Sequence, residues 1–305
     1  MKRYWIYIWG ITFLFAACNS NRQKQRQNDT PSSGTIYISV DESFKPVIEQ
    51  EIEVYHSSYP ETNIVASYKS EADCFRDLQK DSTRMIIVAR GLTKDETSYY
   101  EGKLYFQPQF SIMAYDAVAV IVNIHNPDSV FTLADLKNIL SGKKNIMAVM
   151  DGRNATSTVR YLKDSLLKGG NFGSNVVAAK GSKAVVDVIS KDEHAIGLVG
   201  LSWVGDVYEP EQQANLKKIR LGLVECTTCE EKDMYAKPSQ ATITYAQYPL
   251  TRPLYYILKE NATALGTGFT NFMTMERGQL IFRRACLVPN KMSFNQRFSK
   301  IKEQE

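Results

Sequence analysis

Three short stretches near the start of the chain decide its fold: Thr35-Ile-Tyr-Ile-Ser-Val40, Asn63-Ile-Val-Ala-Ser-Tyr68 and Arg84-Met-Ile-Ile-Val-Ala89. Each is rich in β-branched and apolar residues and has the length of a β-strand. Between them, apolar residues recur at helical spacing behind Pro46, and Ser70 with Asp73 resembles a capping box at a helix start. The alternation of strand and helix predicts a βαβαβ unit with a parallel sheet.

A second alternation follows farther along the chain. Strands are expected at 117–122, 146–150 and 195–200, and helices are expected from Thr132, from about Ser157 and from Ser182. We therefore expect two α/β units in tandem, each with a mainly parallel sheet flanked by helices.

The first 33 residues have the composition of an export signal and a linker. A basic Met1-Lys2-Arg3 precedes an apolar run from Tyr4 to Ala17, which is shorter than the about 20 residues that cross a bilayer. These features predict a signal peptide at 1–17; an uncleaved membrane anchor is the alternative. Phe15-Ala16-Ala17-Cys18 resembles a bacterial lipobox, which makes Cys18 the expected lipidation site. Residues 19–33 lack apolar side chains, so 18–33 is expected to be a flexible tether.

Composition excludes several other classes of protein. The 305 residues are 44% hydrophobic and 23% charged, which is typical of a globular protein. Lys and Arg number 37 against 33 Asp and Glu, and no long basic run is present, so nucleic-acid binding is not expected.

Cys226-Thr-Thr-Cys229 suggests a metal or redox site, but zinc needs about four ligands and the three histidines are scattered. No metal is expected, and the pair is interpreted as a local disulfide or as two thiols in a loop. G-x-S-x-G, Walker, H-E-x-x-H and complete G-x-G-x-x-G motifs are all absent from the sequence, so no enzyme and no cofactor are expected.

Hydroxyl-bearing loops follow several predicted strands and start the next helix. They contain Asp41-Glu-Ser43, Ser70 and Asn154-Ala-Thr-Ser-Thr158. Free N–H groups at a helix start bind anions, and hydroxyls add further donors. Ser and Thr are also ordinary N-caps, so each loop alone is weak support for a site. Together they predict an anion site at the carboxyl ends of parallel strands.

Several stretches together resemble the phosphate-binding lipoproteins of phosphate-uptake ABC transporters, within the type II periplasmic binding protein superfamily. The similarity spans about 34–290, and the stretches that carry it are Asp116–Asn123, Phe131–Gly142, Lys180–Asp187, Ala195–Gly197, Tyr248–Pro253, Gly268–Phe272, Gly278–Gln279 and Leu287–Pro289.

The resemblance implies a set of ligand-binding residues: Ser43, Ser70, Arg90, Thr156, Ser157, Thr158, Arg160 and Asp41. Surface ion pairs are the alternative for Arg90 and Arg160, and helix capping is the alternative for Asp41. The loop Asn154-Ala-Thr-Ser-Thr158 lacks the glycines that are usual at the corresponding place in the family. A carboxylate accepts a hydrogen bond only from a protonated oxyanion, so Asp41 would favour hydrogen phosphate over sulfate.

The resemblance also implies a two-lobed α/β fold and a function. Residues 34–114 plus 248–305 are expected to form lobe 1, and residues 115–247 lobe 2. The implied protein is an exported, lipid-anchored, monomeric binding protein of the cell envelope that passes phosphate to an ABC permease. The alternatives are binding of another oxyanion such as sulfate or molybdate, a secreted hydrolase, and a non-transport surface lipoprotein.

Overall fold

The computed structural model describes residues 29–152 and 156–292. The first third of the described chain contains β1 (Gly34–Asp41), the short 3-10 helix η1 (Glu42–Phe44), α1 (Lys45–Ser58), β2 (Thr62–Lys69), α2 (Glu71–Leu78), β3 (Thr83–Val88), α3 (Lys94–Leu104) and β4 (Gln109–Asn123). The predicted βαβαβ unit is confirmed, because β1 pairs in parallel with both β2 and β3.

The middle of the chain forms a second α/β unit. It contains β5 (Val130–Phe131), α4 (Leu133–Leu140), β6 (Ala148–Met150), α5 (Ser157–Ser165), β7 (Val176–Ala178), α6 (Ser182–Ile189), β8 (Ile196–Gly200), the 3-10 helix η2 (Leu201–Trp203), α7 (Pro210–Leu216), β9 (Ile219–Leu221), β10 (Leu223–Glu225), β11 (Tyr235–Ala236) and α8 (Gln240–Thr244). The strand expected at 146–150 is shorter because its pairing with β7 and β8 covers only Ala148–Met150.

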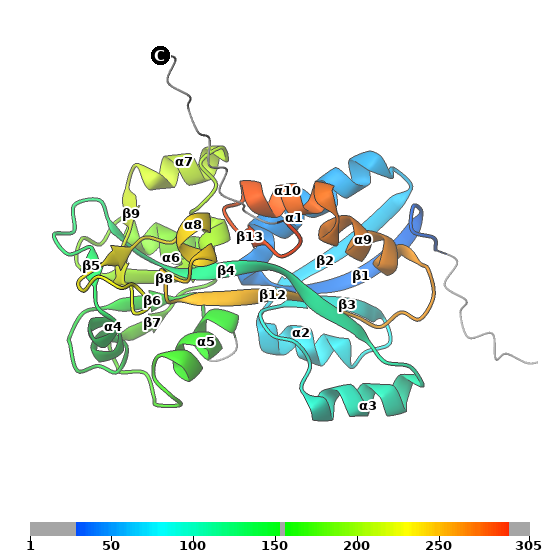
Figure 1. Ribbon diagram of the computed structural model, residues 1–305, viewed down its shortest axis with the longest axis horizontal. Coiled ribbons are helices and arrows are strands. Elements are labelled where there is room, and N and C mark those ends of the chain that lie inside the picture. Colours follow the sequence, from blue (N-terminus) through cyan, green and yellow to red (C-terminus); the bar gives the residue numbers. More distant parts are fainter. Residues whose placement is uncertain (1–28, 153–155, 293–305) are drawn as a thin grey trace, which may run out of the picture.

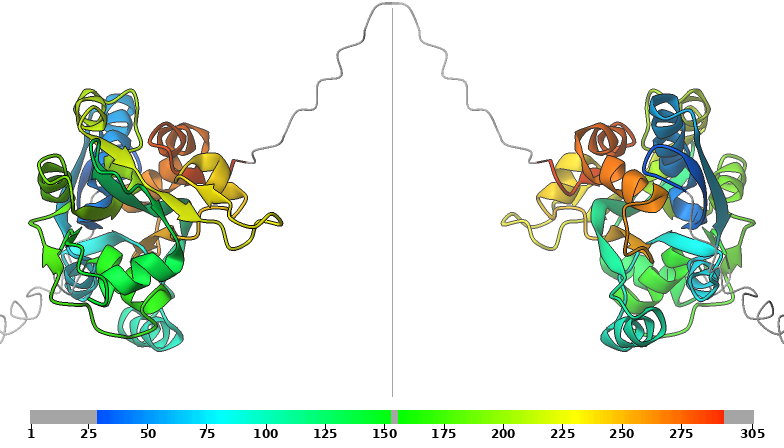
Figure 2. Two further views of the ribbon diagram at one scale, coloured as in Figure 1. Left: turned by 90° about the vertical axis from the view of Figure 1, so that its left-hand side faces the viewer. Right: turned by 90° about the vertical axis from the view of Figure 1, so that its right-hand side faces the viewer.

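The last part of the chain returns to the first unit with β12 (Thr251–Leu258), α9 (Leu265–Thr274), α10 (Glu276–Arg284) and β13 (Val288–Pro289). One sheet runs through the molecule in the order β2-β1-β3-β12-β4-β8-β6-β7, with β9 and β13 also paired to β4 (Figure 1). The small second sheet, β11-β10-β5, holds the yellow β10–β11 segment that projects from the body in Figure 2.

Two main hydrophobic cores divide the molecule into two lobes. The core of lobe 1 takes its residues from 36–114 and 254–287, and the core of lobe 2 takes its residues from 117–250 together with Val288. In Figure 1, α1, α9 and α10 lie on one side of the lobe 1 sheet, and α2 and α3 lie on the other side. The predicted boundaries after residues 114 and 247 stay predictions, although Tyr248 packs into the core of lobe 2.

The strands β4 and β12 connect the lobes. β4 is 15 residues long, and the sequence pattern revealed only its apolar half at 117–122. The sheet of each lobe was expected to be mainly parallel. This half of β4 is an antiparallel exception, because it pairs antiparallel with β8, whereas β6 pairs in parallel with β7 and β8. β12 pairs antiparallel with both β3 and β4. The two strands therefore form a continuous link between the cores.

The end of the expected tether belongs to the folded body. Asp29 forms a buried ion pair with Arg84, with Nη2 2.6 Å from Oδ2, and accepts a hydrogen bond from the backbone N–H of Leu265. The Tyr55 hydroxyl donates to the Pro31 carbonyl. Arg84 also pairs with Glu260, so Asp29 is one of two buried counter-charges of this guanidinium. Residues from Asp29 onward, N-terminal to the expected start at Gly34, thus contact the folded body. The signal peptide and Cys18 lie outside the described residues. Within those residues, no helix is long and apolar enough to cross a membrane.

The Cys226–Cys229 pair was interpreted as a local disulfide or as two thiols in a loop. The structure contains the disulfide. It closes a four-residue loop between β10 and the segment that leads to β11, where the Cys226 N–H donates to the Met234 carbonyl at 2.8 Å. Cys74 and Cys286 are free thiols.

Candidate functional site

A buried ion pair joins the two connecting strands at the centre of the site. The register of β12 against β4 places Arg252 directly opposite Asp116. Arg252 Nε donates to Asp116 Oδ2 at 3.0 Å, and Nη2 lies 2.9 Å from the same oxygen. Both side chains are at most 1% exposed. The guanidinium also lies over the Phe44 ring, 4.9 Å from its centroid. Its Nη1 group points toward α5, whereas Nη2 makes no hydrogen bond within the described residues.

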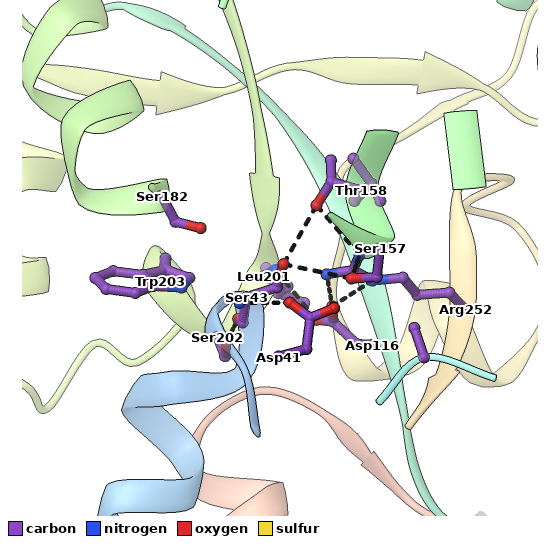
Figure 3. A network of polar contacts seen from close by, with 12 residues as sticks. Asp41, Ser43, Asp116, Ser157, Thr158, Ser182, Leu201, Ser202, Trp203 and Arg252 are labelled. Carbon is purple, nitrogen blue, oxygen red and sulfur yellow. Dashed lines mark hydrogen bonds and ion pairs between the residues drawn. The ribbon is translucent and has the colours of Figure 1, made fainter. Parts of the chain in front are cut away.

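Hydroxyl groups from both lobes surround this guanidinium (Figure 3). Arg252 Nη1 donates to Ser157 Oγ at 2.8 Å and to Thr158 Oγ1 at 3.2 Å. Ser43, from η1 in lobe 1, has its Oγ 3.4 Å from Thr158 Oγ1 and 3.5 Å from Ser157 Oγ. All three hydroxyl-bearing residues are fully buried. The start of α5 in lobe 2 therefore faces the end of β1 in lobe 1.

Asp151 directly follows β6 and binds the same hydroxyls. Its Oδ2 accepts from Thr158 Oγ1 at 2.8 Å and from Ser43 Oγ at 3.1 Å, and its Oδ1 accepts from Thr156 Oγ1 at 2.7 Å. Thr156 is the N-cap of α5, because its Oγ1 accepts from the Val159 N–H at 3.3 Å. The cap is thus Thr156, and Thr158 is free for a different role.

Asp41 ends β1 beside these groups. Its Oδ1 accepts from the Ser43 N–H at 3.0 Å, whereas its Oδ2 is buried and has no hydrogen-bond partner. Burial raises the pKa of Asp41 to about 7, and the charge of Glu71 adds to this, while the charge of Arg252 opposes it. Asp41 therefore has an unused acceptor in the interior of the site.

We use the name polar network for these buried side chains: Asp41, Ser43, Asp116, Asp151, Ser157, Thr158 and Arg252. It contains three carboxylates and one guanidinium. Burial lowers the pKa of Arg252, but Asp116, Asp41 and Asp151 outweigh this and raise it overall. Burial raises the pKa of Asp116 against the opposing effect of Arg252. The network has strong donors at its centre and acceptors around them.

Arg160 lies next to the network in an interlobe ion pair. Its Nη2 donates to Glu71 Oε1 at 3.1 Å, and the same carboxylate oxygen accepts from the Ala89 N–H at 3.0 Å. Glu71 is buried at the start of α2, whereas the Arg160 side chain is 34% exposed. This contact joins α5 of lobe 2 to α2 of lobe 1, so it contributes to the closed arrangement of the lobes.

Two residues implied by the resemblance have their contacts elsewhere. Ser70 is the N-cap of α2, and its hydroxyl donates to Asp73 Oδ2 at 2.6 Å. Arg90 pairs with Glu96, with Nη1 2.8 Å from Oε2, and its guanidinium lies over the Phe75 ring at 3.7 Å. Asp41, Ser43, Thr156, Ser157 and Thr158 do come together. The ligand role of each of these residues stays a prediction.

Four important side chains were not among the expected site residues: Glu71, Asp116, Asp151 and Arg252. Asp116 and Asp151 each lie next to an apolar run of a strand. A charged residue beside a buried strand is unusual, so it could have marked both as candidate site residues. Arg252 lies in a stretch that carried the resemblance, but the strand that contains it was not recognised. Arg252 becomes a site residue because the pairing of β12 with β4 places it opposite Asp116, and this register is known only from the fold.

Further contacts of η1 close the interface between the lobes. The Glu42 carboxylate accepts from the Ser182 N–H at 3.1 Å and from the Ser182 hydroxyl at 2.8 Å, at the first residue of α6. The Ser202 hydroxyl donates to the Ser43 carbonyl at 2.9 Å, and Trp203 Nε1 donates to the Glu42 carbonyl at 3.3 Å. Through these contacts, one short segment of lobe 1 is joined to both α6 and η2 of lobe 2.

Comparison with known proteins identifies relatives by sequence and solved structures of similar fold. "Phosphate-binding protein PstS" of Pseudomonas aeruginosa is 24% identical over 263 residues, covering 78% of this chain and 77% of that protein. The protein of the same name from Staphylococcus saprophyticus is 22% identical over 276 residues, covering 87% and 81%.

A solved structure from Clostridium perfringens, described as a phosphate ABC transporter substrate-binding protein with bound phosphate, is 20% identical. It superimposes with a TM-score of 0.68 over 84% of this chain and 99% of that chain. The family model for the PBP superfamily domain matches residues 26–277, which is most of the chain and includes every residue of the polar network. The chain therefore belongs to the PBP superfamily.

Proposed function

We propose that this chain is a binding protein that captures inorganic phosphate between its lobes and delivers it to the permease of an ABC transporter. The observation that carries the proposal is the convergence of Ser43, Ser157 and Thr158 on Arg252 in a buried position between the lobes. Hydroxyls and a guanidinium are hydrogen-bond donors suited to an oxyanion. The relatives named as phosphate-binding proteins support the same ligand.

An anion can reach these groups only if the lobes separate. Ser43, Ser157 and Thr158 are fully buried, and Arg252 is 1% exposed. β4 and β12 run between the two cores, so they are the elements about which the lobes would open. Closure then removes water from the site, which strengthens each charge-assisted hydrogen bond to the ligand.

Asp41 would give the site its preference for phosphate. The unpartnered Oδ2 of Asp41 can accept a hydrogen bond from the O–H of a protonated phosphate, whereas fully ionised sulfate has no hydrogen to donate. Because the pKa of Asp41 is raised to about 7, chiefly by burial, the group is mostly ionised at pH 8 and mostly protonated at pH 6. A protonated Asp41 could itself donate to sulfate. The preference for phosphate should therefore be greater at pH 8 than at pH 6.

Isothermal titration of the mature protein with phosphate, arsenate, sulfate and molybdate at both pH values tests this proposal. We expect heat of binding with phosphate and with arsenate, which also carries an O–H. No heat with phosphate, against a clear signal with sulfate or molybdate, would assign the site to another oxyanion. No signal with any of the four would favour a non-transport surface lipoprotein.

The proposal includes export and a lipid anchor at Cys18, with the protein held at the cell envelope as a monomer. The basic start, the apolar run and the lipobox-like Phe15–Cys18 support it. Cys18→Ser should abolish labelling with a fatty acid analogue and release the protein from the membrane fraction. Unchanged fractionation of the variant would contradict the lipobox interpretation.

A further inference from the structure

The carboxylate of Asp151 lies where the proposed ligand would bind, and it uses the donors that the ligand would need. It accepts from three hydroxyls, those of Thr156, Thr158 and Ser43, at 2.7, 2.8 and 3.1 Å. Asp151 is 5% exposed. A Cβ atom at Gly152 would lie 2.7 Å from the Thr156 methyl carbon, so glycine at this position leaves room for the Thr156 side chain beside Asp151.

The direction of these hydrogen bonds is set by Arg252. A guanidinium only donates, so Thr158 Oγ1 accepts from Nη1 at 3.2 Å and must direct its own hydrogen elsewhere. Asp151 Oδ2, 2.8 Å away, takes that hydrogen. The Ser43 hydroxyl has one hydrogen, and its shortest contact is also Asp151 Oδ2. Two hydroxyls of the proposed ligand site are therefore already donating to a carboxylate of the protein itself.

We propose that Asp151 is an internal competitor for the oxyanion site, and this inference rests on the proposed function. An incoming phosphate must take the hydrogen bonds of Thr158 and Ser43 from Asp151. The negative charges of the phosphate and of the Asp151 carboxylate then lie side by side and repel each other. Asp151 thus weakens binding and speeds release of the anion. Its role is to set the affinity of the site, in contrast to Arg252, which attracts the anion directly.

The test compares phosphate binding by the wild type, Asp151→Asn and Asp187→Asn at pH 7, using isothermal titration of the full mature chain. Asp187→Asn is the matched control, because it makes the same change of side chain at an exposed position of α6 in lobe 2, outside the buried polar network. We expect Asp151→Asn to bind phosphate at least tenfold more tightly than the wild type, chiefly through slower dissociation. Asp187→Asn should stay within about threefold of the wild type, as expected for a longer-range charge effect.

Equal or weaker phosphate binding by Asp151→Asn overturns the inference and leaves the proposed function standing. An equal gain in both variants also overturns it, because the effect would then be one of overall charge. If neither the wild type nor Asp151→Asn binds phosphate, the proposed function fails and the inference fails with it. Circular dichroism checks folding, and Asp151→Ser is the second variant. If both Asp151 variants are unfolded, Asp151 is a structural residue and the inference is wrong.

Discussion

Replacing Arg252 by Met should destabilise the protein strongly. Arg252 is 1% exposed and its partner Asp116 is fully buried, so the substitution leaves an unpaired carboxylate in the interior. Breaking a buried pair in this way typically costs about 3–5 kcal/mol. The lost hydrogen bonds to Ser157 and Thr158 are part of that figure, because the same guanidinium makes them. We therefore expect the free energy of unfolding to fall by about 3–5 kcal/mol.

Urea denaturation followed by circular dichroism at pH 7 measures this change. The double variant Arg252→Met/Asp116→Leu removes both members of the pair and should recover at least half of the loss. The remainder reflects Asp41 and Asp151, which also lose the charge of Arg252. Arg76→Met is the control, because its ion pair with Asp73 is exposed and should contribute at most about 1 kcal/mol. A loss below about 1 kcal/mol for Arg252→Met, or a double variant no more stable than the single one, would show that this ion pair does not stabilise the fold.

Three further predictions concern single groups. Thr158→Ala should weaken phosphate binding by about 1.5–3 kcal/mol in titration, and wild-type affinity of this variant would exclude the loop from the site. Thr156→Ala removes the N-cap of α5 and should lower the free energy of unfolding by about 0.5–2 kcal/mol. Burial raises the pKa of Glu51, whose carboxylate oxygens have no partner, so the contribution of Glu51 to stability should fall as pH rises above about 4.3. The stability of Glu51→Met relative to the wild type should therefore increase with pH in urea denaturation, and a difference that does not change with pH would count against this prediction. The Cys226–Cys229 disulfide closes a loop of only four residues, so its reduction should lower the free energy of unfolding by no more than about 2 kcal/mol, measured by thermal unfolding. A larger decrease would show that the disulfide stabilises more than this loop.

Local signals in the sequence predicted the helix starts of the fold correctly. Pro46 lies in the first turn of α1, Ser70 caps α2, Thr132 caps α4, and α6 begins at Ser182. These features depend on a few neighbouring residues, because a cap or an initial proline acts within one turn of the helix. The parallel pairing of β1 with β2 and β3 follows from the strand–helix alternation in the same way.

The hydroxyl loops show how far a local pattern extends into the candidate site. Thr156, Ser157 and Thr158 were selected because a strand precedes them and a helix follows, and they do lie at the start of α5 beside Ser43. Ser70 has the same local pattern, yet its hydroxyl is used within its own helix by Asp73. The pattern identifies a helix start and does not determine what faces it.

The two α/β units, the helix starts and the hydroxyls at the start of α5 follow from the amino-acid sequence, because each depends on short-range spacing. The centre of the polar network depends instead on how the strands pair in three dimensions. Arg252 and Asp116 are 136 residues apart and meet because β12 pairs with β4 in one particular register. Asp151 and Ser43 are 108 residues apart and belong to different lobes. Single-sequence spacing contains no information on such pairings, since strand register and lobe packing are set by the whole core.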